Sequence, residues 1–267
     1  MNELITAIVW SVEPEIIKIG SFALRWYGVL FATAFYAGFI IMAKIFKEEK
    51  VPLAELDSLV MYMVAGTVLG ARLGHCFFYD FDYYMAHPIE IVKIWEGGLA
   101  SHGAAIGILI SMYIYTKKIS TKSFLWTADR IVITVALAAF FIRMGNLMNS
   151  EIIGHATNLP WAFVFTRIDE LPRHPTQLYE GFAYLFIFAL LIRIYLKEKA
   201  NLSDGKLFGL FLVCLFSVRF LVEFLKENQS EFENGMALNM GQILSLPLII
   251  VGAYFYKKSL KKQESSH

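Results

Sequence analysis

Seven long apolar stretches constrain the fold of this chain more than any other feature. They lie near residues 21–44, 57–80, 98–116, 124–149, 176–196, 206–225 and 237–256. Each approaches the roughly 20 residues that a helix needs to cross a hydrocarbon core about 30 Å thick. Only 18% of the residues are charged, which is less than soluble domains usually carry. The sequence therefore predicts an all-α integral membrane protein with seven transmembrane helices, built as a single polytopic domain over residues 1–267.

The basic residues between these stretches predict the orientation. Fourteen Lys and Arg residues follow the first, third, fifth and seventh stretches, whereas five lie in the N-terminal segment and the opposite loops. Because basic residues favour cytoplasmic loops, we expect the C-terminus in the cytoplasm and the N-terminus outside. The longest loop, about residues 150–175, is expected to form a small extracytoplasmic cap. Residues 16–25, which reach into the start of the first stretch, are expected to form a short hairpin or an interfacial helix outside.

With this orientation, polar residues from all seven stretches gather in one layer near the outer face of the membrane. Ionisable groups at the centre of a membrane helix cost roughly 2.5–3.5 kcal/mol each, so they persist where they pair, face water or act on a ligand. The densest group is Arg143-Met-Gly-Asn-Leu-Met-Asn-Ser-Glu151 with Gly154, at the end of the fourth stretch. The same layer includes Arg25, Tyr27, Arg72, His75, His102, Gln177, Arg219, Glu223 and Gln242.

Two arginines of this layer, Arg143 and Arg219, indicate a phosphate site. A guanidinium contacts phosphate through two parallel N–H groups, and the abundant phosphate in a bilayer is a lipid head group. Arg219 and Glu223 lie four residues apart, however, and could simply neutralise each other on one helix face. His102 could exchange a proton near neutral pH, or it could be a buried structural histidine.

Other chemistries have less support. No second His or carboxylate lies at ligand spacing beside His102, and the two cysteines form no Cys-x-x-Cys motif, so no metal site is predicted. A net charge of +1 gives no argument for a nucleic-acid partner. Two alternatives stay open. One is a secondary transporter for an anionic metabolite, although its site would lie near the midplane. The other is a seven-span receptor or a non-catalytic lipid-binding protein.

Seven motifs together resemble those of the phosphatidylglycerol–prolipoprotein diacylglyceryl transferases, a family of bacterial plasma-membrane enzymes. In chain order they are Arg25-Trp-Tyr-Gly28, Gly70-Ala-Arg-Leu-Gly74, Glu96-Gly-Gly-Leu-Ala-Ser-His-Gly103, the segment Arg143–Glu151 with Gly154, His174-Pro-Thr-Gln-Leu-Tyr-Glu180, Arg219-Phe-Leu-Val-Glu223 and Met240-Gly-Gln-Ile-Leu-Ser245. The resemblance runs nearly end to end. The segment after Glu223 is only loosely similar, and no role is carried over from it.

The resemblance implies a reaction and its partners. The diacylglyceryl group of phosphatidylglycerol would move to the lipobox cysteine thiol of a prolipoprotein signal peptide, forming a thioether and releasing glycerol phosphate. This is the first step of bacterial lipoprotein maturation. The family implies a multi-pass protein of the bacterial plasma (inner) membrane, among membrane lipids, with its active site toward the outer leaflet. It implies no metal or organic cofactor.

The resemblance also implies roles for individual residues. The expected catalytic residues are His102, Arg143, Arg219 and Tyr27. The expected substrate-binding residues are Arg143, Asn146, Glu151, Gly154, Arg219, Glu223 and Gly98. Within this set, His102 would deprotonate the thiol and the two arginines would hold the phosphate. Glu151 and Glu223 would orient the arginines, and Gly154 would permit a tight turn.

Overall fold

In the computed structural model, residues 7–20, 22–94, 97–98, 100–228, 233 and 235–264 are described. They are mostly helical and form two compact units. The first contains Met1–Ile41 and Ala128–His267, and the second contains Met42–Thr127. Glu96 and Leu99, which belong to one of the seven motifs, lie outside the described residues. The organisation as one polytopic domain stays a prediction.

The first unit holds most of the long helices and two small sheets. Its helices are the first part of α1 (Trp26–Glu48), nearly all of α5 (Phe124–Met148), α6 (Thr176–Glu198), the short η3 (Lys199–Asn201), α7 (Lys206–Glu223) and α8 (Met240–Glu264). Its strands are β1 (Ile8–Trp10), β2 (Glu15–Ile19), β3 (Phe22–Arg25), β4 (Phe163–Phe165) and β5 (Pro172–Arg173). An all-α description therefore omits two small sheets.

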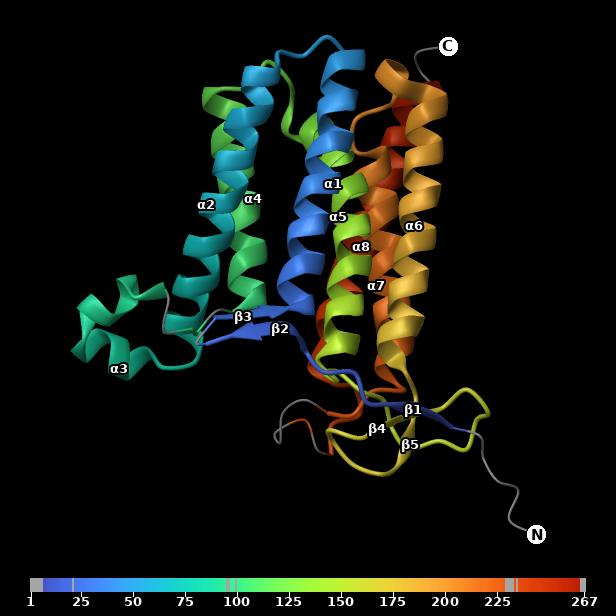
Figure 1. Ribbon diagram of the computed structural model, residues 1–267. Helices are drawn as coiled ribbons and strands as arrows, with labels where there is room; N and C mark the ends of the chain where they lie inside the picture. The colour runs from blue at the N-terminus through green and yellow to red at the C-terminus, as the bar shows by residue number, and fades with distance from the viewer. Residues whose placement is uncertain are drawn as a thin grey trace. The chain divides into compact units, whose positions relative to one another are not determined.

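The second unit is built around α2 (Leu53–Phe78) and α4 (Ser101–Lys118), which lie side by side in Figure 1. Between them come α3 (Phe81–Ala86) and η1 (Pro88–Val92). Glycines allow the two long helices to approach closely: a Cβ atom on Gly74 would lie 2.6 Å from the Cα of Gly103. Small residues at helix crossings serve this purpose in membranes. The glycines of the Gly70–Gly74 motif are therefore packing residues.

Five helices among the described residues are long and apolar enough to cross a membrane: Trp26–Glu48, Leu53–Phe78, Phe124–Met148, Thr176–Asn201 and Met240–Gln263. This confirms a multi-pass membrane protein. The helices α4 and α7 have 18 residues each, and α7 includes three charged residues, Lys206, Arg219 and Glu223. The count of seven spans and the orientation stay predictions.

A small cap lies beyond the end of α5 and the beginning of α6 (Figure 1). In it β1 pairs in parallel with β4, and β5 pairs antiparallel with β4. The aromatic side chains of Phe163 and Phe165 pack on Leu147 at the end of α5, together with Trp10. The Trp10 indole also donates a hydrogen bond to the Leu147 carbonyl at 3.0 Å. This contact fixes the end of α5, which carries the densest polar motif.

The predicted hairpin before the first long helix is present. Strands β2 and β3 pair antiparallel, and Gly20, in the turn between them, has a φ of +61° that favours glycine. Arg25 lies 3.4 Å from Glu15 on the exposed side of this hairpin. Arg25 is therefore a surface residue in this structure, as an interfacial position would require.

At the other end of the first unit, Asp129 explains how α7 begins. Its carboxylate accepts hydrogen bonds from the backbone N–H groups of Gly205 and Phe208, both at 2.7 Å. These N–H groups have no partner within the helix, so a buried carboxylate from α5 satisfies them. Asp129 also lies 3.9 Å from its neighbour Arg130, near the start of α5.

Candidate functional site

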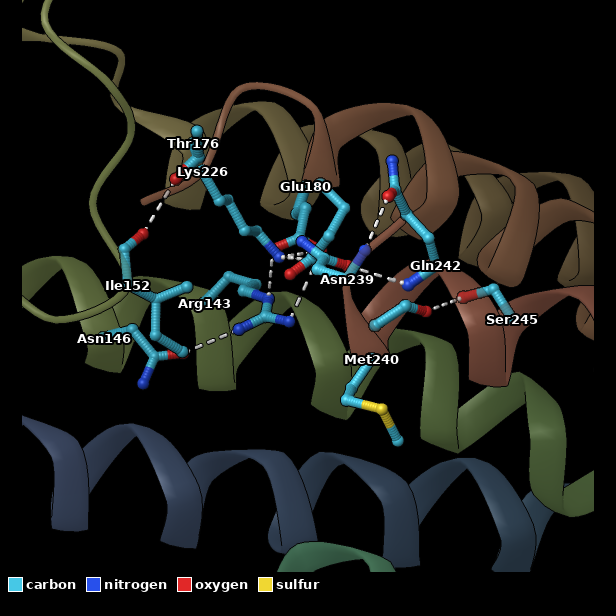
Figure 2. Close-up of polar contacts among 12 residues, drawn as sticks. Arg143, Asn146, Ile152, Thr176, Glu180, Lys226, Asn239, Met240, Gln242 and Ser245 are labelled. Carbon is cyan, nitrogen blue, oxygen red and sulfur yellow. Dashed lines mark hydrogen bonds and ion pairs between the residues drawn. The ribbon is translucent and has the colours of Figure 1, made fainter. Parts of the chain in front are cut away.

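The site is centred on Arg143, which lies near the end of α5 and faces the first turns of α6. Its Nε atom is 2.8 Å from Oε2 of Glu180, and its Nη2 atom donates to Oε1 of the same carboxylate at 3.4 Å. Glu180 is fully buried (0% exposed). One edge of the guanidinium is therefore held by a carboxylate from another helix, as Figure 2 shows.

Lys226 supplies a second buried cation at the same carboxylate. Its Nζ atom is 3.0 Å from Oε1 of Glu180 and 3.0 Å from Oε2 of Glu223, and the side chain is only 2% exposed. The hydroxyl of Tyr184 donates to Oε1 of Glu180 at 2.9 Å. Buried charges are tolerated when they are paired and hydrogen-bonded in this way. Glu180 thus joins helices α5 and α6 to the segment that follows α7.

The Nη1 end of the Arg143 guanidinium contacts a hydrogen-bonded series of polar side chains that ends at Glu151. Its Nη1 atom donates to Oδ1 of Asn146 at 3.2 Å, and Nδ2 of Asn146 donates to Oε2 of Glu151 at 3.2 Å. Asn149 donates to the second oxygen of Glu151 at 3.1 Å. Because guanidinium can only donate and carboxylate can only accept, the Asn146 amide has one consistent orientation. Glu151 therefore acts on Arg143 through Asn146, whereas Glu180 is the direct partner.

The turn after α5 brings Glu151 back toward the helix. Ser150 and Ile152 have positive φ values of 55° and 58°, which cost energy for residues with side chains. The first turn of α6 holds this turn in place. Gln177 donates to the Glu151 carbonyl at 2.6 Å, and Thr176 donates to the Ile152 carbonyl at 2.7 Å. This explains why buried polar residues begin α6.

Gly154 permits a close approach between two backbone segments. Its backbone bridges antiparallel to that of Lys226, and the His155 N–H donates to the Leu225 carbonyl at 2.8 Å. A Cβ atom at position 154 would lie 2.7 Å from that carbonyl oxygen and 2.6 Å from the Cβ of His174. Gly154 is not among the residues with positive φ, so its role here is space for the Lys226 segment, and the strained turn lies at Ser150 and Ile152.

Tyr27 and Glu223 also lie against this cluster. A Cβ atom on Gly145 would be 2.7 Å from the ring of Tyr27, so this ring packs on α5 at Gly145, in the same helical turn as Arg143 and Asn146. A Cβ atom on Gly241 would be 2.7 Å from the carboxyl carbon of Glu223, so the first turn of α8 covers that carboxylate.

Arg219 lies one turn before Glu223 on α7 and is partly exposed. Among the described residues, no hydrogen bond or ion pair involves its side chain. The alternative in which Arg219 and Glu223 neutralise each other is therefore not what the structure contains, because Glu223 pairs with Lys226. Gln242 accepts a hydrogen bond from the Asn239 N–H at 3.1 Å and so helps to begin α8 (Figure 2).

His102 and Gly98 belong to the second unit. His102 is exposed in the first turn of α4, and its ring lies 5.5 Å from that of Phe78 and 5.8 Å from that of Tyr79. It is therefore not a buried histidine. Gly98 has a φ of +68°, and a Cβ atom there would lie 2.5 Å from the ring of His75. Both constraints favour glycine at that position.

Arg72 has a structural role in this second unit. It is 4% exposed and donates four hydrogen bonds to backbone carbonyls, those of Glu90, Ile91, Gly97 and Gly98. Its guanidinium also lies 5.1 Å from the centre of the Tyr84 ring. Arg72 thus holds the segment between α3 and α4 against α2, which accounts for a buried arginine without any ligand.

A second polar network lies in the cap, outside the long helices. Arg173 contacts Asp169 through Nε and Nη2 and contacts Glu227 at 2.7 Å through Nη1. The hydrogen bond from Arg173 lowers the pKa of Asp169. Partial burial alone would raise the pKa of Glu227, but hydrogen bonds from Arg173 and His155 lower it. Burial lowers the pKa of His174, and the neighbouring His155 lowers it further.

Two residues of the cluster, Glu180 and Lys226, had no role in the sequence interpretation. Glu180 ends the His174–Glu180 motif, and Lys226 stands three residues after Glu223. On a helix that spacing would put opposite charges on one face, and this was the available signal for Lys226, although Lys226 lies in the segment that follows α7. Among the described residues, no group of three His, Cys, Asp or Glu side chains is arranged to hold a metal ion.

Comparison with known proteins agrees with these motifs. The family model described as prolipoprotein diacylglyceryl transferase matches residues 14–257. A protein of Chloroherpeton thalassium is 47% identical over 96% of this chain and 96% of its own length. One of Tolumonas auensis is 46% identical over 96% of this chain and 99% of its own, and one of Bacteroides fragilis is 42% identical over 98% of this chain and 100% of its own. All three are named phosphatidylglycerol–prolipoprotein diacylglyceryl transferase. The chain therefore belongs to the prolipoprotein diacylglyceryl transferase family.

Proposed function

We propose that this protein transfers the diacylglyceryl group of phosphatidylglycerol to the lipobox cysteine thiol of a prolipoprotein, the first step of lipoprotein maturation. The observation that carries the proposal is the arrangement of Arg143. Glu180 fixes one edge of its guanidinium and Asn146 contacts the other end, within the densest polar motif of the sequence. Membership of the family, with relatives of nearly the same length, supports the reaction class.

The reaction requires a nucleophile and a stabilised leaving group. The thiol of the acceptor cysteine loses its proton, and the thiolate sulfur attacks the glycerol carbon that carries the phosphate. A carbon–sulfur bond forms as the carbon–oxygen bond breaks, and the electron pair leaves with glycerol phosphate. A free thiol has a pKa of about 8.5, so a general base accelerates the attack. Charge grows on the departing phosphate, where oriented donors stabilise the transition state most.

The residues of the first unit are suited to hold that phosphate. Arg143 is fixed at its Nε edge and can direct N–H groups of the Nη1 and Nη2 edge to phosphate oxygens. Arg219, partly exposed one turn from Glu223, provides the second guanidinium. Asn146 and Tyr27 contribute hydrogen bonds to the glycerol head group or the thiol. Glu151 and Glu223 position the cationic side chains, and Gly154 keeps the segment of Lys226 close.

His102 is the proposed general base. It is exposed at the start of α4, and an imidazole changes its protonation near neutral pH, which suits removal of a thiol proton. Gly98, in the loop before α4, has a conformation that favours glycine and allows the substrate to pass close to the backbone. The reaction includes no oxidation and no activated acyl group, so these side chains can support it without a cofactor.

The arrangement in the membrane follows from the charge distribution. Seven spans, including the shorter α4 and α7, would place the N-terminus and the cap outside and the C-terminus in the cytoplasm. The Arg143 cluster would then lie in the outer leaflet of the bacterial inner membrane, at the depth of the phosphatidylglycerol head group. The lipobox cysteine of a signal peptide reaches the same depth.

The test uses purified protein in lipid nanodiscs with phosphatidylglycerol and a lipobox peptide. The peptide should gain the mass of one diacylglyceryl group, and one glycerol phosphate should be released for each modified peptide. A peptide with Ser in place of the acceptor Cys should stay unmodified. An unmodified Cys peptide in the presence of folded protein would overturn the proposal. Uptake of an organic anion by proteoliposomes under those conditions would then favour a transporter.

A further inference from the structure

Glu180 joins the charged side chains of the Arg143 cluster, and its role goes beyond the substrate contacts proposed above. Its carboxylate is fully buried and contacts Arg143, Lys226 and Tyr184. Arg143 and Lys226 both reach Oε1, at 3.4 and 3.0 Å, so their nitrogen atoms are no more than 6.4 Å apart. Two cations that close repel each other strongly in a buried site unless a carboxylate lies between them.

The contacts of Arg143 show what Glu180 determines. The pair through Nε and Oε2 measures 2.8 Å and is shorter than the hydrogen bond to Asn146, at 3.2 Å. The carboxylate of Glu180 contacts the guanidinium at two nitrogen atoms, through an ion pair at Nε and a hydrogen bond at Nη2, and two contact points constrain the plane of the guanidinium as well as its position. Lys226 differs from Arg143 because it keeps a second carboxylate, Glu223, when Glu180 is removed. Loss of Glu180 would therefore disturb Arg143 more than Lys226.

We infer that Glu180 is a positioning residue for the transfer reaction, which sets the plane of the Arg143 guanidinium and so directs the remaining N–H groups of Nη1 and Nη2 toward the phosphate. This inference rests on the proposed function. Glu180 acts through Arg143 and does not touch the substrate. The alternative is that Glu180 only neutralises the buried charge of Lys226. In that case Glu180 would become unnecessary when Lys226 is replaced by an uncharged residue, whereas a positioning residue would still be needed.

The first experiment compares Glu180→Gln with the matched control Glu198→Gln. Both changes remove one charge from α6, and Glu198 pairs with Lys206 at 2.6 Å near the other end of the helix. A misplacement of reacting groups on the scale of 1 Å costs about 10²-fold in rate, so kcat of Glu180→Gln should fall by about 10- to 100-fold. Glu198→Gln should keep the wild-type kcat. Equal kcat values for both variants and the wild type would overturn the inference.

The second experiment separates positioning from charge neutralisation. In the double variant Glu180→Gln/Lys226→Met, kcat should stay low, because Arg143 still lacks its partner. Recovery to the rate of Lys226→Met alone would overturn the inference. In an Arg143→Lys background, Glu180→Gln should cause little further loss, since residues that act as a unit are not additive. Independent, multiplying losses would contradict a role through Arg143.

Folding is checked for every variant by thermal unfolding in detergent. If Glu180→Gln does not fold, Glu180→Asp replaces it, because it keeps the charge but shortens the reach to Arg143 by one methylene. It should lower kcat while leaving the phosphatidylglycerol KM nearly unchanged, and a wild-type kcat would overturn the inference. Wild-type protein that performs no transfer at all would instead refute the proposed function, so the two failures are distinguishable.

Discussion

Replacing Gly154 by alanine should damage both stability and transfer, for a reason that the backbone geometry makes quantitative. The added Cβ atom would lie 2.7 Å from the Leu225 carbonyl oxygen and 2.6 Å from the Cβ of His174. Ordinary contact begins near 3.4 Å, so the neighbouring segments must separate by about 0.7 Å. Overpacking of this kind typically costs about 1–3 kcal/mol.

The displaced segment is the one that carries Lys226 into the cluster, three residues after Glu223. A shift of that size at reacting groups reduces rates by about 10- to 100-fold. We therefore expect Gly154→Ala to lower kcat in the nanodisc assay and the unfolding temperature in detergent. The control is Gly38→Ala, since the nearest atom to a Cβ on Gly38 would be the Cβ of Thr134, at an ordinary 3.4 Å. Wild-type kcat and stability in Gly154→Ala would refute the reasoning.

Three further predictions concern other parts of the protein. His102→Asn should lower kcat by about 10²–10⁴-fold, the usual contribution of a general base, with little change in the phosphatidylglycerol KM, and a wild-type kcat would remove His102 from the role of base. Arg173 lowers the pKa of Asp169, so this ion pair stabilises the cap at pH values above the ordinary carboxyl pKa. The stabilisation is lost as the pH falls through the lowered pKa and Asp169 is protonated. The free energy of unfolding of Arg173→Met should therefore depend less on pH below about pH 4 than that of the wild type. Parallel acid-unfolding curves for the two proteins would argue against this. Asp129→Ala leaves two buried N–H groups of α7 without a partner and should lose about 1–3 kcal/mol of stability in chemical unfolding, with kcat per folded molecule unchanged.

The long apolar helices could be predicted from the sequence because hydropathy over about 20 residues decides whether a helix can enter a bilayer. The grouping of Arg143, Asn146 and Glu151 could also be predicted, since one helix end and one turn bring them together. The pairing of Arg143 with Glu180 could not. It depends on which faces of α5 and α6 meet, and hydropathy does not encode that choice in helices that are apolar on most sides.

Lys226 shows a second limit of sequence reasoning. It reaches the site because the segment after α7 pairs with the backbone at Gly154, a contact between residues far apart in the chain. Within the sequence it looked like one more basic residue of an outer loop. Gly154 in turn was expected to serve a turn, and its importance for close approach becomes visible only when the partner segment is placed beside it.

The transfer rate of Arg143→Lys at saturating phosphatidylglycerol tests the central claim most directly, because the change keeps the positive charge and removes the planar pair of N–H donors. If Arg143 stabilises the charge that develops on the departing phosphate, kcat should fall by about 10²–10³-fold while the protein remains folded in the membrane. A kcat within about threefold of the wild type would show that a point charge suffices, and the assignment of Arg143 as an oriented phosphate ligand would then be wrong.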